Sequence, residues 1–281
     1  MTGVSQGARA LPAPPLRSFL GPYAGYRLSG YPPGVHLGMP APELTVVVSL
    51  DSPLAVTATA HPEQPAGAWG ALASGLATSA VTIAHDGTQH GVQLALTPAG
   101  SRALLGAPAG ALGAWIVDLR DVLGPDAREL TERIAAEPGW PGRFAILDEV
   151  LLRRAVDDAV DRNLARAWQR LTSPGAPRVA DVAREIGWSR RHLVGRFTAE
   201  FGVGPKDAMR VARFHRSKGL QQLCPSMTLA DVAARCGFYD QAHLAREWRA
   251  LAGVPPSRWR ADEQFPLVQD DARFDGASSG A

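Results

Sequence analysis

The 281-residue chain contains no long hydrophobic run and very little cysteine. A transmembrane helix needs about 20 consecutive apolar residues, so the sequence predicts no membrane span and no membrane partner. The N-terminal stretch MTGVSQGARALPAPPLRSF has no basic segment followed by an apolar core, so it does not resemble a secretory signal. Two cysteines occur, Cys224 and Cys236, and no metal-ligand spacing surrounds them. We therefore expect a reduced, cytoplasmic protein.

The sequence patterns of enzymes are also missing. There is no glycine-rich phosphate loop and no nucleophile elbow, because the serine in GSRALLG lacks the required glycines. His36, His61, His85 and His90 could bind a metal, but they form no HxH, HxxxH or HExxH-like cluster. His85 and His90 could equally cap the turn that they flank. We expect no catalysis, no cofactor and no metal, and keep a metal-dependent sensor or enzyme in the N-terminal half as the alternative.

The charge is distributed unevenly along the chain. Residues 176–261 carry 15 Arg and Lys against 7 Asp and Glu, a net charge of +8, although the whole chain carries only +2. Residues 1–175 have a net charge of −2 and residues 262–281 a net charge of −4. A basic block of this size indicates a polyanionic partner, with nucleic acid first. A solvated basic face would have the same composition, so charge alone leaves both interpretations open.

The N-terminal half has the pattern of a mainly β domain followed by helices. ELTVVVSL predicts a buried strand, and AVTIAHDGTQHGVQLAL predicts a hairpin that turns at Asp86-Gly87. GSRALLG and ARELTERIAAE have helical periodicity, and residues 144–171 predict a helix pair or one long helix. TSPGAP, residues 172–177, is typical of a linker. A pocket lined by aromatic side chains is possible in this half, and its candidates are Tyr23, Tyr26, Tyr31 and Trp69.

Two stretches near the C-terminus have nearly the same sequence, VADVAREIGWSRRHLVGRF and LADVAARCGFYDQAHLAREW. In each, apolar residues fall at i, i+3, i+4 and i+7, which predicts a short amphipathic helix. These are Val179, Val182, Ala183 and Ile186 in the first copy and Leu229, Val232, Ala233 and Cys236 in the second. Gly187 or Gly237 follows, and then an aromatic residue, Trp188 or Phe238. Because glycine tolerates positive φ at a helix end, the pattern predicts a sharp turn into a second helix.

The second helix of each copy begins at a capping residue, Ser189 or Asp240. It ends before Gly202 or Gly253. The residues expected to be buried are Leu193 and Phe197 in the first copy and Leu244 and Trp248 in the second. Short helix, glycine turn and second helix make a helix-turn-helix unit, whose second helix lies in the DNA major groove. A helical repeat array would give the same pattern but requires a third copy, which the sequence does not contain.

Residues 178–260 resemble the DNA-binding domain of AraC-type (arabinose-regulator-like) transcription factors. The first copy resembles that family's first unit, and MTLADVAARCGFYDQAHLAREWRALAGVPPSRWR resembles the second. KDAMRVARFHRSKGLQQL between them resembles the linking helix, with Arg213, Ser217 and Leu220 at the family's Arg, small-residue and Leu positions. The resemblance implies that one chain places two recognition helices in successive major grooves, about 34 Å apart.

The resemblance also implies which residues meet DNA. On the first recognition helix Arg191 suits guanine, Val194 suits a thymine methyl, and Gly195 lacks the longer polar side chain that the family often has. On the second, Gln241 suits adenine and Arg246 suits guanine. The expected base-reading residues are Arg191, Val194, Gly195, Gln241, Ala242, Ala245 and Arg246. The expected phosphate contacts are Ser189, Arg190, Arg196, Lys206, Arg210, Arg249, Arg258 and Arg260, with Arg184 as a further candidate. His192 and His243 recur at one place and are expected to pack or contact phosphate.

Taken together, these patterns predict an α+β protein of two domains. Residues 1–170 form a mainly β, barrel-like sensor or dimerisation domain with helices, which loosely resembles the cupin-like N-terminal domains of some AraC-type regulators. Residues 171–262 form an all-α domain with two helix-turn-helix units, and residues 263–281 a disordered acidic tail. The expected function is a bacterial, sequence-specific transcription regulator, an activator that responds to an effector. Its expected partners are double-stranded DNA, RNA polymerase, a small molecule and a second copy of the chain. A non-specific architectural binder of nucleic acid is the other alternative.

Overall fold

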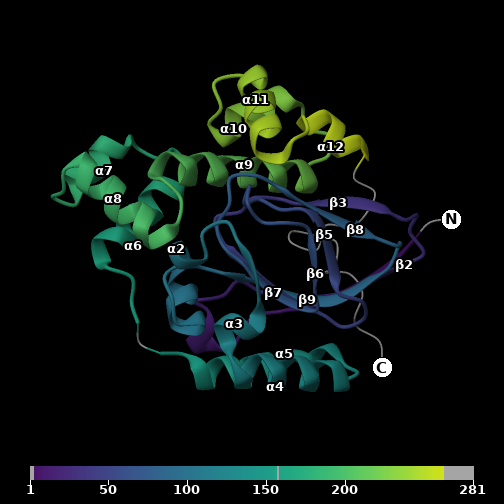
Figure 1. Ribbon diagram of the computed structural model, residues 1–281. Coiled ribbons are helices and arrows are strands. Elements are labelled where there is room, and N and C mark those ends of the chain that lie inside the picture. The colour runs from purple at the N-terminus through teal and green to yellow at the C-terminus, as the bar shows by residue number, and fades with distance from the viewer. Residues whose placement is uncertain (1–2, 157, 263–281) are drawn as a thin grey trace.

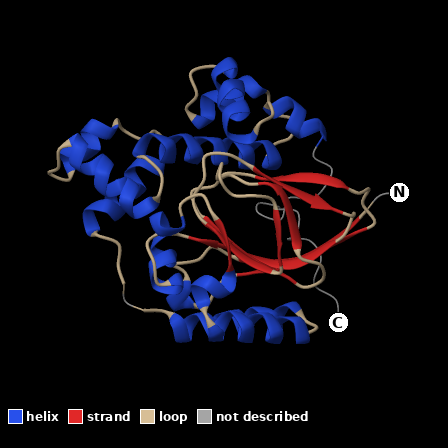
Figure 2. Cartoon of the chain, viewed as in Figure 1, coloured by secondary structure: helices blue, strands red, loops and turns tan. Residues whose placement is uncertain are grey.

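In the computed structural model, a β-rich N-terminal domain is joined to a group of helices at the C-terminal end (Figures 1 and 2). The structure describes residues 3–156 and 158–262, so the predicted acidic tail lies outside the described residues. The predicted α+β class is confirmed. None of the helices in the described ranges combines the length and the apolar character that crossing a membrane requires.

The N-terminal domain is built on two antiparallel sheets. The larger has the order β1 (Val4–Ala10), β2 (Tyr23–Ser29), β9 (Gln89–Leu96), β4 (Leu44–Ser49), β7 (Ala71–Ser74) and β10 (Ile116–Asp118). The smaller has the order β3 (Gly34–Gly38), β8 (Val81–His85), β5 (Leu54–Ala58) and β6 (Gly67–Trp69). Val47 and Leu72 of the larger sheet share a buried cluster with Val56 and Ile83 of the smaller, so the two sheets face each other. The predicted strand ELTVVVSL is β4.

The predicted hairpin around Asp86-Gly87 is wrong in its pairing. Both of its strands exist, but β8 pairs with β3 and β5, whereas β9 pairs with β2 and β4. The turn therefore carries the chain from the smaller sheet to the larger one. Gly87 has a φ of +99°, and a Cβ there would clash with the carbonyl oxygen of Tyr31. The tight turn that the dipeptide predicts is present, but the hydrophobic faces of the two strands belong to different sheets.

Short helical segments follow the last long strand. They are α1 (Pro98–Gly100), a π-helical turn at Ser101–Leu105, α2 (Ala109–Leu112) and α3 (Leu119–Leu123). The longer helices α4 (Pro125–Ala136) and α5 (Trp140–Arg154) lie side by side along the outside of the larger sheet (Figure 1). The helical periodicity of ARELTERIAAE is thus confirmed in α4.

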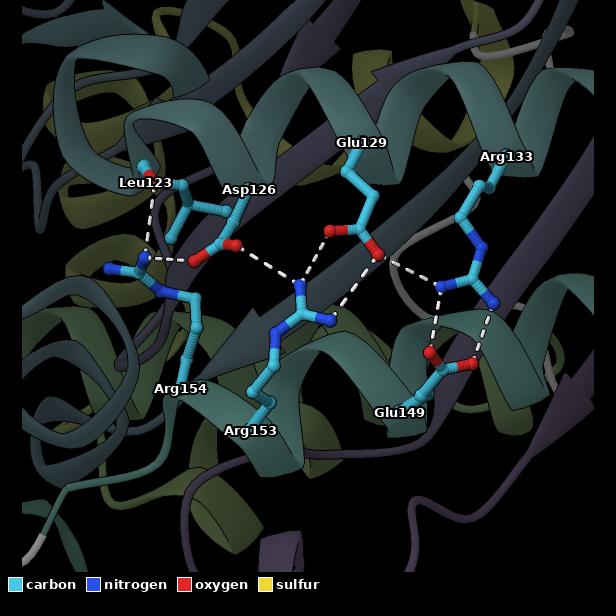
Figure 3. Close-up of polar contacts among 7 residues, drawn as sticks. All are labelled: Leu123, Asp126, Glu129, Arg133, Glu149, Arg153 and Arg154. Atoms are coloured by element: carbon cyan, nitrogen blue, oxygen red, sulfur yellow. Dashed lines mark hydrogen bonds and ion pairs between the residues drawn. The ribbon is translucent and has the colours of Figure 1, made fainter.

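A row of ion pairs joins α4 to α5 (Figure 3). Arg153 of α5 bonds both Asp126 and Glu129 of α4, and Arg133 of α4 bonds Glu129 and Glu149. Arg154 adds a bond to Asp126 and another to the Leu123 carbonyl oxygen. Arg153 and Arg133 hold the pKa of the Glu129 carboxyl below its ordinary value. Because the row is solvated on one side, it fixes the alignment of the two helices more than it adds stability.

The remaining helices form the C-terminal group. They are α6 (Arg162–Thr172), α7 (Val179–Glu185), α8 (Arg190–Phe201), α9 (Pro205–Leu223), α10 (Leu229–Cys236), α11 (Gln241–Ala252) and α12 (Pro256–Asp262). Residues 144–171 are a helix pair, because α5 ends at Arg154 and α6 starts at Arg162. The expected domain start at residue 171 falls inside α6. Trp168 of α6 stacks on Phe197 and Phe201 of α8, so α6 packs with the C-terminal helices.

Candidate nucleic-acid interface

The two predicted helix-turn-helix units are present. The first is α7 with α8, and the second is α10 with α11. Their expected core residues Leu193, Phe197, Leu244 and Trp248 are all fully buried. Each second helix ends at a left-handed glycine, Gly202 or Gly253, as the sequence predicts.

The turns of the two units are built alike. Gly187 and Gly237 have φ of +74° and +77°, which the turn requires. The backbone N–H of the aromatic residue after each glycine then donates back into the first helix. Trp188 bonds the Ala183 oxygen at 2.8 Å, and Phe238 bonds the Ala233 oxygen at 2.9 Å. The repeated sequence therefore encodes a repeated backbone geometry.

Side-chain caps fix the start of both recognition helices. The Ser189 hydroxyl accepts from the His192 N–H at 3.1 Å, and the Asp240 carboxylate accepts from the His243 N–H at 2.6 Å. Both histidine rings lie edge-on to the turn aromatic, at 4.6 Å between the centroids of His192 and Trp188. The Nδ1 of His243 also accepts from the Tyr239 N–H. Packing, one of the two roles expected of these histidines, is confirmed.

Helix α9 connects the two units and packs against both of them (Figure 1). Ser217, at the family's small-residue position, is fully buried, and its hydroxyl accepts from Trp248 Nε1 at 2.9 Å. Phe214 lies against the same tryptophan ring. These contacts join α9 to the core of the second unit.

The expected base-reading side chains lie on the outer faces of α8 and α11. Arg191, Gly195, Gln241, Ala242 and Arg246 are exposed, and Ala245 is half-buried. Val194 is 38% exposed, although it is apolar. Within the described residues, neither Arg191 nor Arg246 forms an ion pair, so both guanidinium groups can meet a new partner.

The expected phosphate contacts differ in how far they are engaged inside the protein. Arg190, Arg196, Lys206, Arg249 and Arg258 are exposed. Arg184, also exposed, pairs with Asp181. Arg210 pairs with Asp207 and Glu247, and Arg260 bonds the Met227 carbonyl oxygen and the Gln221 side chain. Ser189 is the helix cap described above. The charge of Arg210 is partly neutralised within the protein.

The structure adds three residues that the sequence analysis does not name as DNA contacts. Tyr239 is 92% exposed and is the extra residue in the second turn. Arg178 and Arg213 line a hollow beside Lys206 and Arg190. The one-residue length difference between the two turns was a signal for Tyr239. Arg178 and Arg213 line one hollow only because the start of α7 lies across from α9 in the fold, which no local pattern gives.

The N-terminal domain holds both units. Arg102 makes a bidentate ion pair, at 2.7 and 2.8 Å, with Glu200 near the end of α8. Glu200 is only 8% exposed, and Arg102 also pairs with Asp158 between α5 and α6. These carboxylates hold the pKa of the Arg102 guanidinium above its ordinary value. On the other side, the Ala80 N–H donates to the Leu251 oxygen of α11 at 2.8 Å.

A cavity of about 100 Å³ lies between the two sheets. Aliphatic side chains make up much of its lining, and Tyr26, His36, Gln93 and Glu43 supply polar groups. Burial lowers the pKa of His36 to about 4, so the ring is neutral near pH 7. Of the four aromatic residues considered for a pocket, Tyr26 lines this cavity, whereas Tyr23 is fully buried and bonds Asp148 instead.

The four N-terminal histidines do not meet at one point. The rings of His36 and His85 are 5.6 Å apart, His61 stacks on Trp115, and His90 bridges Asp51 and Arg143. His85 Nδ1 accepts from the Gly87 N–H and so caps the turn. Within the described residues, no three His, Cys, Asp or Glu side chains come together as a metal site would need.

Comparison with known proteins agrees with this geometry. A family model described as a helix-turn-helix domain matches residues 182–262, which contain most of the first unit and all of the second. An uncharacterized HTH-type transcriptional regulator of Staphylococcus aureus is 29% identical over 84 residues, which cover 30% of this chain and 11% of that protein. The regulator YbfI of Bacillus subtilis is 33% identical over 64 residues, 23% of this chain and 22% of that one. This chain thus spans about a tenth to a fifth of the curated relatives it matches.

Solved structures extend the similarity to the whole fold. ToxT from Vibrio cholerae is 13% identical, with a TM-score of 0.50 over 86% of this chain and 98% of that chain. An apo variant of ToxT from strain SCE256 is 11% identical, with a TM-score of 0.53 over 85% and 97% of the two chains. At this level of identity the similarity shows the fold, a β-rich N-terminal domain followed by two helix-turn-helix units.

Proposed function

We propose that the protein is a sequence-specific, DNA-binding transcription regulator. The observation that carries this proposal is the pair of equivalent helix-turn-helix units, joined by one helix, with both outer recognition faces exposed. One chain would thereby supply two half-site contacts, which other helix-turn-helix proteins obtain by dimerisation. We place it in the cytoplasm, where bacterial DNA lies, and the proposal includes no catalytic step.

Within this proposal, Arg191 and Arg246 read guanine and Gln241 reads adenine, because their donors and acceptors match those base edges. Val194 contacts a thymine methyl, and Ala242 and Ala245 allow close approach to the bases. Arg190, Arg196, Lys206, Arg249 and Arg258 contact phosphates and set affinity without reading sequence. Ser189 caps the start of α8, and this cap orients the backbone N–H groups of the first turn toward the DNA.

The first experiment selects duplexes bound by the full chain from a random pool and then measures Arg246→Ala on the selected duplex. We expect binding to weaken by roughly 1–3 kcal/mol and the preference at one base pair to relax. Arg128→Gln, a change of an exposed arginine on α4, is the matched control and should leave binding unchanged. Equal loss on selected and scrambled duplexes would contradict the assignment of Arg246 to a base.

The same measurement separates this function from a non-specific architectural binder. Both proteins would lose affinity steeply with salt, because both release counterions from phosphates. A regulator keeps a large affinity ratio between selected and scrambled duplexes at every salt concentration. A ratio near one would favour the architectural binder.

We also propose that regulation involves the cavity between the sheets. Leu37 and Met39 of the cavity lining are also packed in the hydrophobic cluster of the second unit, with Val211 and Phe214 of α9. A ligand in the cavity would therefore contact Leu37 and Met39, the residues that pack against α9. In the described part of the chain, the lining contains Glu43 and no Lys or Arg, which suits a small uncharged molecule better than an anion.

Coupling between such an effector and DNA would act in both directions. Isothermal titration of uncharged metabolites, with and without the selected duplex, tests for it. An effector that binds with equal affinity in both states would contradict the coupling. RNA polymerase and a second copy of the chain remain proposed partners of the bound regulator.

A further inference from the structure

A groove of about 460 Å³ runs between the first helix-turn-helix unit and α9, and its lining is strongly basic. Its eight lining residues are Arg178, Val179, Ala180, Arg190, Lys206, Met209, Arg210 and Arg213. We propose that this groove binds the DNA backbone between the two half-sites, so that α9 is a phosphate-binding floor as well as a spacer. This inference rests on the proposed regulator function and names a surface that extends beyond the recognition helices, of which it includes only Arg190.

Three elements contribute the positive charges. Arg178 caps the start of α7, and Arg190 begins α8, whereas Lys206, Arg210 and Arg213 come from α9. The α9 residues, with Met209, fall at spacings of three, four and seven along the helix, so they share one face. None of the described residues that line the groove is acidic, although Asp207 and Glu247 partly neutralise Arg210 from its edge.

Contacts of α9 place the groove between the starts of the two recognition helices. On one side, Arg190 is the first residue of α8. On the other, Arg213 Nη1 bonds the Gly237 oxygen at 3.4 Å, and its guanidinium lies 5.6 Å from the Phe238 ring centre. Gly237 and Phe238 form the turn that leads into α11. A duplex that meets both recognition helices must pass the segment of α9 between them.

The character of the groove fits a phosphodiester chain better than a base edge. Its polar groups are cationic donors at the ends of long side chains, which bind phosphate oxygens without reading sequence. Arg178, Arg190 and Lys206 are exposed and form no ion pair within the described residues. Duplex DNA carries one charge per about 1.7 Å of its axis, so a backbone strand crossing the groove can meet several of these cations at once.

The experiment compares Arg178→Gln and Lys206→Gln in the full chain with the control Arg128→Gln, on the selected duplex and on a scrambled one. We expect each groove change to weaken binding about three- to tenfold on both duplexes and to reduce the slope of log K against log salt by about 0.9. Arg178→Lys keeps the charge and should keep the wild-type slope. Because the changed residues are exposed, thermal melting should be that of the wild type.

A second arm locates the contact on the DNA. Methylphosphonates replace the phosphates between the two half-sites, which removes their charge. The wild-type chain should bind this duplex more weakly than the natural one. The double variant Arg178→Gln/Lys206→Gln should bind the two duplexes with nearly equal affinity. The proposed backbone contact would be overturned by groove variants that keep the wild-type salt slope. It would also be overturned by variants whose loss of affinity relative to the wild type is as large on the neutralised duplex as on the natural one.

Failure of the proposed function would be seen separately. A wild-type chain with equal affinity for selected and scrambled duplexes would overturn the regulator, and with it any spacer between half-sites. If the wild-type chain prefers the selected duplex but the groove variants bind as Arg128→Gln does, only the proposed backbone contact of the groove is overturned.

Discussion

At the scale of single residues, Gly195 stands on the outer face of the first recognition helix where a side chain would have room. A Cβ built at Gly195 meets no atom within 4 Å. Because alanine is the better helix former, Gly195→Ala should stabilise the protein by about 0.5–1 kcal/mol. Chemical denaturation measures this. Gly219→Ala in α9, where a Cβ also meets nothing, is the matched control and should give a similar gain.

Substitutions at the two glycines should differ only in their effect on DNA binding. Gly195 lies on the proposed base-reading face, whereas Gly219 does not, so Gly195→Gln should alter the preferred base at one position of the selected duplex. Gly219→Gln should leave the preference as it is. Destabilisation by Gly195→Ala would show that the helix face is covered and would count against its role at the interface.

His36 makes stability depend on pH. Burial lowers its pKa from the ordinary 6.5 to about 4, with a smaller contribution from His85. The unfolded chain therefore binds a proton between pH 6.5 and pH 4 that the folded chain does not. The contribution of His36 is present above pH 6.5 and is lost as the pH falls toward 4, on the order of 3 kcal/mol in total.

The change His36→Gln removes this titration. We expect its free energy of unfolding to fall less steeply than that of the wild type between pH 6.5 and pH 4.5, measured by urea denaturation at each pH. His61→Gln is a control on a half-buried histidine that stacks on Trp115. Identical pH slopes for wild type and His36→Gln would show that His36 is protonated at little cost in the fold.

At the scale of elements, the sequence predicts the second half of the chain better than the first. The short helices, turns and recognition helices of residues 178–260 carry local signals, namely apolar spacing, glycine at positive φ and caps at Ser189 and Asp240. In the N-terminal half the strands β8 and β9 also carry local signals. Their partners do not, because pairing is decided by which sheet buries each face. That is why the Asp86-Gly87 hairpin was predicted and the sheet-crossing turn was not.

The start of the C-terminal unit is a second feature that local sequence signals do not predict. TSPGAP has the composition of a linker, but α6 before it packs against the first helix-turn-helix unit through Trp168. Arg216 of α9 also donates to the Thr172 oxygen at 2.6 Å. Glycine and proline mark a turn there without marking a boundary between domains. We propose that the DNA-binding unit begins at Asp161, the cap of α6.

Two fragments test this boundary. A fragment of residues 161–262 should fold cooperatively and bind the selected duplex, because it keeps Trp168 over Phe197 and Phe201. A fragment of residues 173–262 exposes those two rings and should be less stable by about 2–4 kcal/mol, or unfolded. Circular dichroism melts of both fragments decide the matter. Equal melting of the two would show that α6 belongs with the N-terminal domain.

At the scale of the whole molecule, the N-terminal domain holds the two units at separate places. The first is attached by Arg102–Glu200 and by close backbone contact, and the second by Met39 and the bond from Ala80 to Leu251. The linking helix therefore does not act alone in setting the angle between the recognition helices. None of these long-range contacts has a sequence signal, since each joins residues far apart in the chain.

Gly110 is the position where this attachment is tightest. A Cβ there would clash with the Ala199 carbonyl oxygen of α8 and would approach the backbone of Gly202. Because backbone cannot move aside as a flexible side chain can, Gly110→Ala should push α2 and α8 apart and cost about 1–3 kcal/mol. It should also weaken the Arg102–Glu200 pair, so that trypsin cuts near Arg154 and Arg162, between α5 and α6, several times faster. Gly70→Ala, where a Cβ meets nothing within 4 Å, controls for the substitution itself.

The effect on DNA distinguishes attachment from mere instability. The 161–262 fragment lacks residue 110, so it reports the affinity of the two units when the N-terminal domain does not hold them. If the N-terminal domain sets the angle between the units, Gly110→Ala should move the affinity of the full chain toward that of the fragment, measured at a temperature where the variant is folded. A variant that is cut faster but keeps the wild-type affinity would mean that α9 by itself fixes the geometry of the two recognition helices.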